Sequence, residues 1–198
     1  ISPGIASPPP DANESRFKFL WEEHSRLVCS NHAPQKGGVR PVAMELSGKV
    51  SSGLGRAHVF MAQPHYQEQF RALLGKTAWP GTLNVTVHGT DLINYIALRK
   101  KSGIDTLDAS TEDRDAALNV PVGSFEAHRI RGFLRDGVSF GGATAFIAEF
   151  KTQSGTIACA LLIPDLTRHI DVVEVIAGAC LREKFNLEDD ALVQIKLD

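Results

Sequence analysis

Short runs in which apolar and polar residues alternate dominate the chain from residue 45 onward. In the clearest run, Leu83, Val85 and Val87 alternate with polar residues, and this two-residue period is typical of a strand with one face in the core. The other runs that predict strands cover residues 45–51, 58–62, 124–131, 144–150, 156–163 and 191–197. Many short strands with few helices between them predict a mainly β protein that forms a small closed barrel.

Three segments have the apolar spacing of helices. Residues 64–74 place large apolar side chains on one face, begin with a proline and are followed by Gly75, all of which favour a helix. Asp171 is placed to cap a short helix over residues 172–177, which a following glycine would end. Residues 181–185 predict one further helical turn.

The first 45 residues are predicted to form an extension of the barrel domain. Residues 1–14 are rich in Pro, Ser and Ala and indicate a disordered or extended tail. Residues 16–28 carry apolar side chains at helical spacing, which predicts an amphipathic helix that packs on the main body. We therefore expect an extension over residues 1–45 and a barrel domain over residues 46–198. Inside that domain, residues 98–119 are polar and charged, which indicates a solvated loop.

Composition excludes several classes of protein. The chain has 198 residues, of which 43% are hydrophobic and 22% charged, which is enough for one well-packed core. A net charge of −2 gives no electrostatic footprint for nucleic acid. The longest apolar stretch, residues 157–163, is too short to span a bilayer, and three cysteines without metal-ligand spacing fit a reducing compartment. We therefore expect a cytoplasmic protein that binds neither nucleic acid nor membrane.

Two glycines lie close together just after the first predicted strand. Gly53 and Gly55 allow positive φ and a close approach of the backbone, so that successive N–H groups can bind an anion. Arg56 and His58 could add charge or hydrogen bonds. The segment lacks the Gly-Lys-Ser/Thr of a Walker A loop and the full dinucleotide-binding pattern. The alternative is an ordinary tight turn.

A second segment carries candidate metal ligands. Thr82 and Asn84 project together from the face opposite the apolar stripe of the predicted strand. A hydroxyl and an amide carbonyl are neutral oxygen ligands that Mg²⁺ accepts when phosphates and waters supply the rest. The alternative is a plain edge strand whose Thr and Asn face water. Together, the two segments point to a nucleotide-binding site.

Four short motifs occur in the same order as in the archaeal CTP-dependent riboflavin kinases, and the chain resembles that family over roughly residues 46–198. The motifs lie in Gly48–Gly55, Pro80–Asn84, Ile163–Ala177 and Leu181–Leu187. The segment after Asp91 looks longer than is usual in the family.

The resemblance implies a fold, an activity and a set of site residues. The family has a six-stranded cradle-loop barrel and transfers the γ-phosphoryl group of CTP to the 5′-hydroxyl of riboflavin, which gives FMN and CDP. By resemblance, Thr82 and Asn84 would hold Mg²⁺, and Thr167 and Glu174 would contact riboflavin or FMN. The nucleotide would be bound by Gly53, Leu54, Gly55, Arg56, Ala57 and His58 and, from the other side, by Ala179, Cys180, Leu181 and Arg182.

Two of these residues are candidates for a catalytic role. Arg182 would stabilise phosphate charge, and its alternative is a surface ion pair with Glu183 or Asp189. Glu174 would accept a hydrogen bond from the flavin and is a candidate general base for the attacking hydroxyl. Its alternative is a glutamate on the solvent-facing side of a helix.

The glycine segment departs from the family pattern Gly-x-Gly-Glu-Gly, because Arg56 replaces the acid and Ala57 the last glycine. If that glycine takes positive φ, Ala57 would add about 1 kcal/mol of strain. A second hypothesis is a non-catalytic flavin- or nucleotide-binding regulator on the same barrel. Some members regulate transcription through an N-terminal winged helix, for which the residues before Leu46 look too few.

Overall fold

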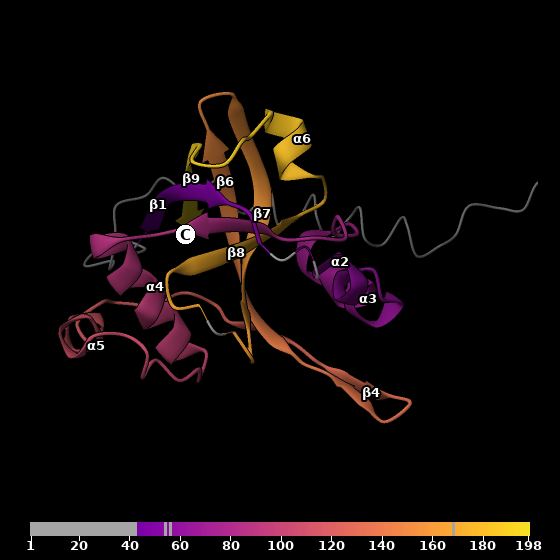
Figure 1. Cartoon of the computed structure of the whole chain (residues 1–198), viewed down its shortest axis with the longest axis horizontal. Coiled ribbons are helices and arrows are strands. Elements are labelled where there is room, and N and C mark those ends of the chain that lie inside the picture. Colours follow the sequence, from indigo (N-terminus) through magenta and orange to yellow (C-terminus); the bar gives the residue numbers. More distant parts are fainter. Residues whose placement is uncertain (1–42, 54, 56, 168) are drawn as a thin grey trace, which may run out of the picture. The chain divides into compact units, whose positions relative to one another are not determined.

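The structure, a computed structural model, describes residues 43–198 except for positions 54, 56 and 168 (Figure 1). The described residues belong to one compact unit, Pro41–Asp198. The predicted tail over residues 1–14 and the predicted amphipathic helix over residues 16–28 lie outside the described residues. They stay predictions, as does the division into an extension and a barrel domain.

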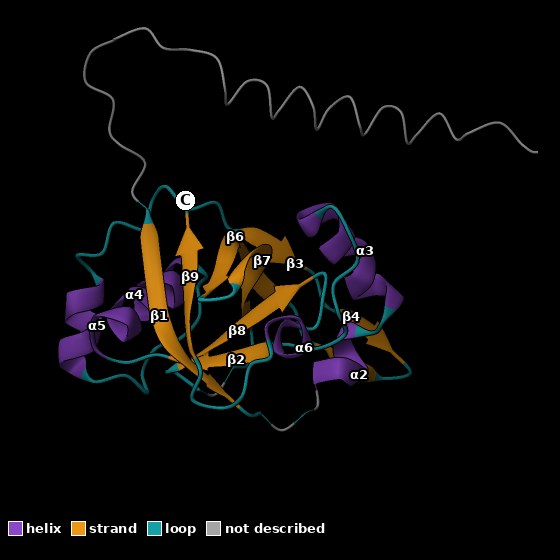
Figure 2. Cartoon of the chain, turned by 90° about the horizontal axis from the view of Figure 1, so that it is seen from above, coloured by secondary structure: helices purple, strands orange, loops and turns teal. Residues whose placement is uncertain are grey.

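Six antiparallel strands form a closed barrel, which confirms the predicted fold class (Figure 2). Going round the barrel, hydrogen bonds join β6 to β7, β7 to β8, β8 to β2, β2 to β1 and β1 to β9. A further pairing, with Phe150 of β6 opposite Ile195 of β9, closes the ring. The strands are β1 (Met44–Ser51), β2 (Leu83–Thr86), β6 (Ala143–Thr152), β7 (Gly155–Pro164), β8 (Val172–Ala177) and β9 (Leu192–Leu197).

Side chains that alternate along these strands fill the barrel. Leu46, Val85, Phe150 and Ile195 are fully buried in one cluster, and each such side chain contributes roughly 1.5–3 kcal/mol to the free energy of folding. A Cβ on Gly48 would lie 2.5 Å from the Thr86 carbonyl oxygen. Strands β1 and β2 therefore approach each other so closely that only glycine fits at this position.

Most of the predicted strands are confirmed with shifted ends, namely those that became β1, β2, β6, β7 and β9. Within residues 124–131 only β3 (His128–Ile130) is a strand, and it pairs with β6. An unpredicted hairpin follows, made of β4 (Phe133–Arg135) and β5 (Val138–Phe140). In its turn, Asp136 and Gly137 have φ values of 50° and 75°, as two-residue hairpin turns require.

The predicted helix over residues 172–177 is wrong, because this segment is strand β8. Its run of β-branched residues packs well on a pleated surface. Val175 also has Leu83 of β2 opposite it on one side and Leu161 of β7 on the other. The apolar residues have spacings that fit both the period of a helix and the period of a strand. Because β2 and β7 pair with the two edges of this segment, it forms a strand.

Residues 58–62 are not the predicted strand, because α2 (Ala57–Met61) is a short helix. Met61 is its buried residue, whereas Val59 and Phe60 are about half exposed, so the segment does not have the buried face of a barrel strand. The next helix, α3 (Pro64–Leu74), is confirmed with its predicted bounds, and Gly75 ends it with a φ of 71°. Helix α6 (Leu181–Phe185) is also confirmed.

The predicted loop over residues 98–119 is wrong in large part, because α4 (Gly89–Lys101) and α5 (Thr111–Ala117) occupy it. The apolar face of α4 is buried, although its exposed side is strongly charged. The Ser110 side chain accepts a hydrogen bond from the Asp113 N–H and caps α5. In the part of the chain that the structure describes, no helix is long and apolar enough to cross a membrane.

Candidate functional site

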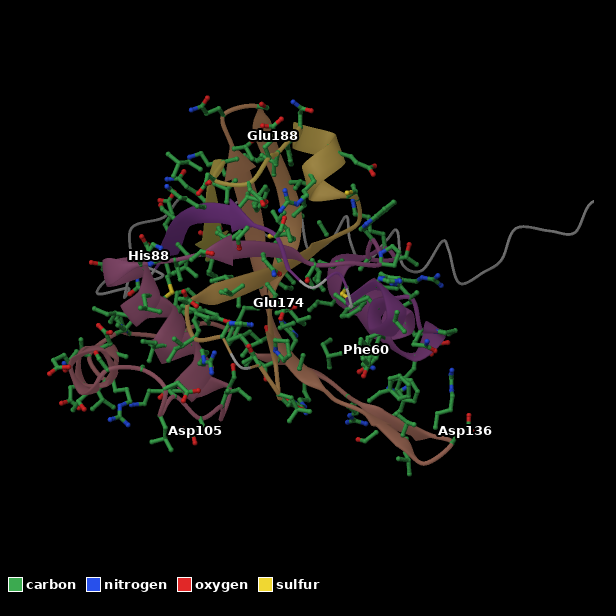
Figure 3. The ribbon with its side chains drawn as sticks, viewed as in Figure 1. Phe60, His88, Asp105, Asp136, Glu174 and Glu188 are labelled. Carbon is green, nitrogen blue, oxygen red and sulfur yellow. The ribbon has the colours of Figure 1, made fainter. Side chains whose placement is uncertain are left out.

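A cavity of about 410 Å³ lies between the barrel strands and helices α2 and α3. Glu174 of β8 belongs to its barrel side and Phe60 of α2 to its helical side (Figure 3). Most of the remaining lining is apolar. The residues of the lining are Ala57, Phe60, Met61, Tyr66, Phe70, Thr82, Ile130, Gly141, Gly142, Ala143, Leu162, Pro164, Leu166, Thr167, His169 and Glu174.

Three of the predicted site residues meet on the barrel side. Asn84 lies opposite Glu174 in the pairing of β2 with β8. Thr82 Oγ1 lies 3.5 Å from Asn84 Oδ1, so the two candidate metal ligands share one face, as the alternation predicts. The strand they belong to is not at an edge, because β1 and β8 flank β2.

The Glu174 carboxyl is half-buried and faces the cavity. It belongs to a strand, so it is not the solvent-facing helix residue of the alternative interpretation. Burial raises the pKa of Glu174, while a hydrogen bond from the Thr82 hydroxyl and the charge of His169 partly offset the rise. That hydroxyl carries one proton and donates either to Glu174 or to Asn84 at a given moment. A carboxyl in such surroundings is typical of a functional site.

The glycine segment is in contact with the candidate metal ligands. A Cβ on Gly53 would lie 2.5 Å from Asn84 Nδ2, so the glycine allows the backbone to approach that side chain. Gly55 has a φ of 66°, and its carbonyl oxygen lies 2.7 Å from His58 Nδ1. Leu54 and Arg56 lie outside the described residues.

Ala57 is the first residue of α2 and also lines the cavity. As a residue of an α-helix it has a negative φ, so the strain expected at the missing third glycine does not arise. The same five-residue helix thus follows the glycine segment and contributes to the cavity wall.

Helix α6 is tied to the end of β1, directly before the glycine segment. Arg182 Nη2 donates to Asp189 Oδ1 at 2.6 Å and to the Ser51 carbonyl oxygen at 3.1 Å. The Ser52 hydroxyl donates to the same carboxylate. The Arg182 guanidinium and then the Ser52 hydroxyl hold the pKa of Asp189 below its usual value. The ion pair of the alternative interpretation is therefore present, and it holds Arg182 beside the glycine segment.

The other predicted residues of this side differ in exposure. Ala179 and Cys180 are partly exposed before α6, whereas Leu181 is buried in the barrel core. The Leu181 side chain therefore packs inside the protein, and only its backbone is left to contact a ligand.

The helical side of the cavity is rich in aromatic side chains, a feature that the sequence does not reveal. Phe133 and Phe140 of the hairpin stack with ring centroids 4.5 Å apart, and Phe60 meets the Phe140 ring edge-on at 5.7 Å. Tyr66 also lies near Phe133, at 5.5 Å. The apolar face predicted for residues 64–74 contained Tyr66 and Phe70, but nothing in that pattern distinguishes a cavity wall from a closed core.

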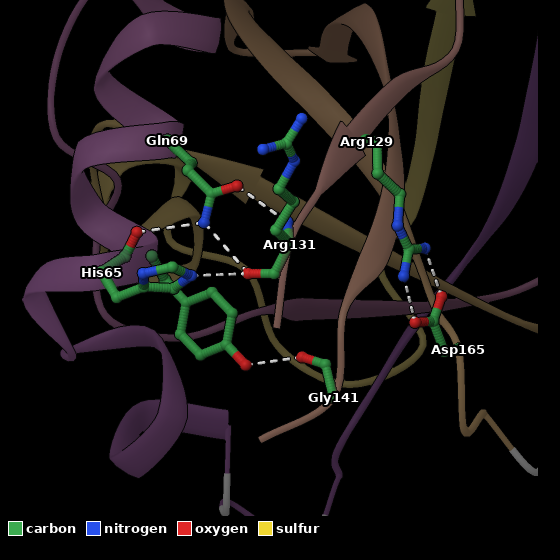
Figure 4. Close-up of polar contacts among 7 residues, drawn as sticks. His65, Gln69, Arg129, Arg131, Gly141 and Asp165 are labelled. Carbon is green, nitrogen blue, oxygen red and sulfur yellow. Dashed lines mark hydrogen bonds and ion pairs between the residues drawn. The ribbon is translucent and has the colours of Figure 1, made fainter. Parts of the chain in front are cut away.

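Side-chain to backbone hydrogen bonds attach α3 to the strand region beside it (Figure 4). The Tyr66 hydroxyl donates to the Gly141 carbonyl oxygen at 2.5 Å. The Arg131 carbonyl oxygen lies 2.8 Å from His65 Nε2 and accepts from Gln69 Nε2 at 3.1 Å, while Gln69 Oε1 accepts from the Arg131 N–H at 2.7 Å. These contacts hold the helical wall in place.

The segment after β7 forms the rest of the wall. Asp165 makes a two-pronged ion pair with Arg129 (Figure 4). Thr167 and His169 line the cavity, and the Thr167 hydroxyl donates to the His169 carbonyl oxygen at 3.5 Å. The two residues predicted to contact the flavin, Thr167 and Glu174, are thus brought to one cavity.

The oxygens of Thr82 and Asn84 fit two neighbouring ligands of a small cation. With metal–oxygen distances of 2.0–2.1 Å, adjacent ligands in an octahedron lie about 2.9 Å apart, close to the 3.5 Å between Thr82 Oγ1 and Asn84 Oδ1. Among the described residues, no three His, Cys, Asp or Glu side chains form a metal-binding group. A cation here would therefore depend on a bound phosphate and on waters for its other ligands.

Comparisons with known proteins identify relatives over nearly the whole described chain. The family model CTP-dep_RFKase, described as domain of unknown function DUF120, matches residues 50–118 and 104–197. A riboflavin kinase of Methanoculleus marisnigri is 33% identical over 153 residues, which cover 77% of this chain and 56% of that protein. A riboflavin kinase of Methanocorpusculum labreanum is 30% identical over 175 residues, or 88% of this chain and 66% of that protein.

A third relative matches a longer part of the chain. The riboflavin kinase of Halobacterium salinarum is 31% identical over 189 residues, which cover 95% of this chain and 67% of that protein. The chain therefore spans between about half and two thirds of the length of these relatives.

Proposed function

Because the chain belongs to the CTP-dependent riboflavin kinase family, we propose that it transfers the γ-phosphoryl group of CTP to the 5′-hydroxyl of riboflavin and releases FMN and CDP. One observation carries the proposal. Thr82 and Glu174 line an apolar cavity, while the adjacent Asn84 contacts Gly53 of the glycine segment. A flavin site and a phosphate site would thus adjoin along a single strand.

The cavity suits the flavin. Its volume of about 410 Å³ lies within the range of small-molecule sites. The aromatic side chains of the helical side favour a planar, largely apolar ring. Thr167 and Glu174 add polar partners near the barrel, where the ribityl chain would approach the donor.

The phosphates would bind where the glycine segment meets α6. Backbone N–H groups of residues 53–58 would hold phosphate oxygens, with Leu54 and Arg56 among those assigned by resemblance. Residues 179–182 would close the nucleotide site from the other side. Arg182 would neutralise charge on the transferred group, and its bond to Asp189 keeps it next to Ser52.

Thr82 and Asn84 would hold Mg²⁺, which when bound neutralises phosphate charge. Phosphoryl transfer of this kind depends mainly on alignment and charge stabilisation. Glu174 would accept a hydrogen bond from riboflavin and so orient the attacking hydroxyl. Its carboxyl, with a pKa raised by burial, is also the candidate base for the proton of that hydroxyl.

One experiment tests the proposal directly. The protein is incubated with riboflavin, Mg²⁺ and either CTP or ATP, and FMN is measured by chromatography. We expect FMN with CTP and far less with ATP, because the triphosphates are identical and hydrogen bonds to the pyrimidine edge can distinguish the two donors. Equal yields would contradict the CTP preference. Riboflavin binding without FMN from either donor would favour a non-catalytic flavin-binding regulator instead.

A further inference from the structure

A buried arginine lies behind the cavity wall that Thr167 and His169 form. Arg99 of α4 is only 3% exposed. Its Nη1 donates to the His169 carbonyl oxygen at 2.6 Å, and its Nη2 donates to the Asp105 carbonyl oxygen at 3.1 Å. Within the described part of the chain, Arg99 takes part in no ion pair, and its Nε has no hydrogen-bond partner.

This arrangement is costly and therefore calls for an explanation. A buried charge without an acidic partner is unfavourable, and a hydrophobic residue at this position of α4 would avoid that cost. Arginine offers a rigid fork of donors that reaches two carbonyl groups at once. The Tyr95 ring, with its centroid 5.9 Å from the Arg99 guanidinium carbon, gives the charge one further favourable contact.

The carbonyl that Arg99 holds belongs to His169, which is a residue of the cavity lining. The His169 carbonyl oxygen also accepts the hydrogen bond of the Thr167 hydroxyl. Ile170, the next residue, packs against Ile96 and Ala97 of α4. His169 and Ile170, the residues that lead into β8, are thus fastened to α4.

We propose that Arg99 is a positioning residue for the flavin side of the site. It fixes the His169 carbonyl and thereby the orientation of the Thr167 hydroxyl toward the flavin, without touching the substrate itself. The proposal rests on the proposed function, since it assigns to α4 the task of shaping the flavin pocket. It also gives a role to the segment that composition alone marks as a solvated loop.

The test compares flavin binding with nucleotide binding in full-length variants. Arg99→Met keeps the length of the side chain and removes its donors. We expect the dissociation constant for riboflavin, measured by quenching of flavin fluorescence, to rise about tenfold, the effect of one misplaced hydrogen bond between the pocket and the flavin. The dissociation constant for CDP, measured by calorimetry, should change less than about twofold. In steady-state kinetics, KM for riboflavin should rise while KM for CTP stays near the wild-type value.

The matched control is Arg114→Met on α5, since Arg114 is half-buried and hydrogen-bonds Thr111 of its own helix. It should leave both dissociation constants unchanged. If Arg99→Met weakens riboflavin and CDP binding equally, Arg99 has only a general structural role and the proposal is wrong.

A second variant keeps the proposal testable if Arg99→Met does not fold. Arg99→Lys retains the charge but cannot reach both carbonyls in the same way, so we expect weaker riboflavin binding and faster amide exchange at residues 166–171. A folded Arg99→Lys protein with wild-type riboflavin binding and wild-type exchange in this segment would overturn the proposal. Absence of riboflavin binding by the wild-type protein would instead overturn the proposed function, and the positioning role with it.

Discussion

The two sides of the cavity are held in place in different ways. On the barrel side, Asn84 and Glu174 lie opposite each other in strands that are each paired on both edges. Their separation is set by the main-chain ladder. On the helical side, α2 has five residues and the β4–β5 hairpin has two short strands. The hairpin contacts α2 through the rings of Phe60 and Phe140, and α3 is attached by side-chain contacts such as the bond from Tyr66 to Gly141.

This difference suggests a division of tasks. Groups that must align reacting atoms need positions fixed to a fraction of an ångström, which continuous strands provide. A wall held by a few side chains opens at lower free energy, and it can admit a flat ring and then close on it. We therefore expect substitutions on the barrel side to affect phosphoryl transfer and those on the helical side to affect riboflavin binding.

The largest expected effect is on the barrel side, at Asn84. Asn84→Ala removes a proposed Mg²⁺ ligand, and we expect kcat/KM to fall about 100-fold with little change in the melting temperature, because the side chain is not part of the core. Thr86→Val, one pleat further along β2, is the control and should keep most of the activity. Calorimetry that finds wild-type CDP affinity for Asn84→Ala in saturating Mg²⁺ would refute the metal assignment.

The second effect distinguishes positioning from base catalysis at Glu174. For Glu174→Gln we expect KM for riboflavin to rise about tenfold with little change in kcat, the pattern of a lost binding interaction. A general base would instead lose about 10²–10⁴ in kcat at unchanged KM. Steady-state kinetics with riboflavin varied separates the two, and Glu149→Gln on the exposed face of β6 is the control. Wild-type kinetics for Glu174→Gln would remove this residue from the site.

The third effect concerns the helical side and is measured as stability. Tyr66→Phe removes the bond to the Gly141 carbonyl and should lower the free energy of unfolding by about 1 kcal/mol, with a modest rise in KM for riboflavin. Ser139→Ala on β5 is the control, because it also removes one hydroxyl but from an exposed residue outside the cavity lining. Its loss should be nearly neutral. Equal destabilisation of the two variants in urea would show that the bond to Gly141 contributes nothing specific.

The smallest effect is a pH dependence of stability at Glu174. Because burial raises its folded-state pKa above the ordinary value of about 4.3, the folded protein binds the proton more tightly than the unfolded chain. The stabilising contribution of the protonated carboxyl is therefore complete below that value and is lost as the pH rises through the folded-state pKa. In urea titrations from pH 4 to pH 7, wild type should lose stability relative to Glu174→Gln. A relative gain would mean that the Thr82 and His169 contacts outweigh burial.

Much of the barrel could be predicted from local patterns, and the failures have physical causes. Alternation located five barrel strands because at least part of each strand has one face more buried than the other. It predicted a helix where β8 forms, because the spacing of Val172, Val173, Val175 and Ile176 fits both a helix and a strand. Only the pairing with β2 and β7 makes the segment a strand. Helix α4 was not predicted because its sequence is strongly charged, although one face of the helix, which includes Arg99, is buried.

The site could be predicted where it depends on short motifs and not where it depends on distant contacts. Glycine, threonine and asparagine at fixed spacing marked the barrel side, and the structure brings Gly53 and Asn84 together. No local pattern indicates that Phe133 and Phe140 stack beside α2 or that Arg99 reaches His169. Those contacts join segments that are far apart in the chain, so they become visible only in the folded protein.

The seam of the barrel joins its first strand to its last. Met44 of β1 pairs with Leu197 of β9, and β9 also completes the ring by pairing with β6. Almost the entire barrel sequence must therefore be synthesised before the ring can close. The closing contacts join residues at opposite ends of the barrel sequence. Such topologies fold on the millisecond-to-second scale rather than in microseconds. Until the last strand docks, side chains such as Phe150 have no complete interior to occupy, and that interval is when the nascent protein is most prone to aggregation.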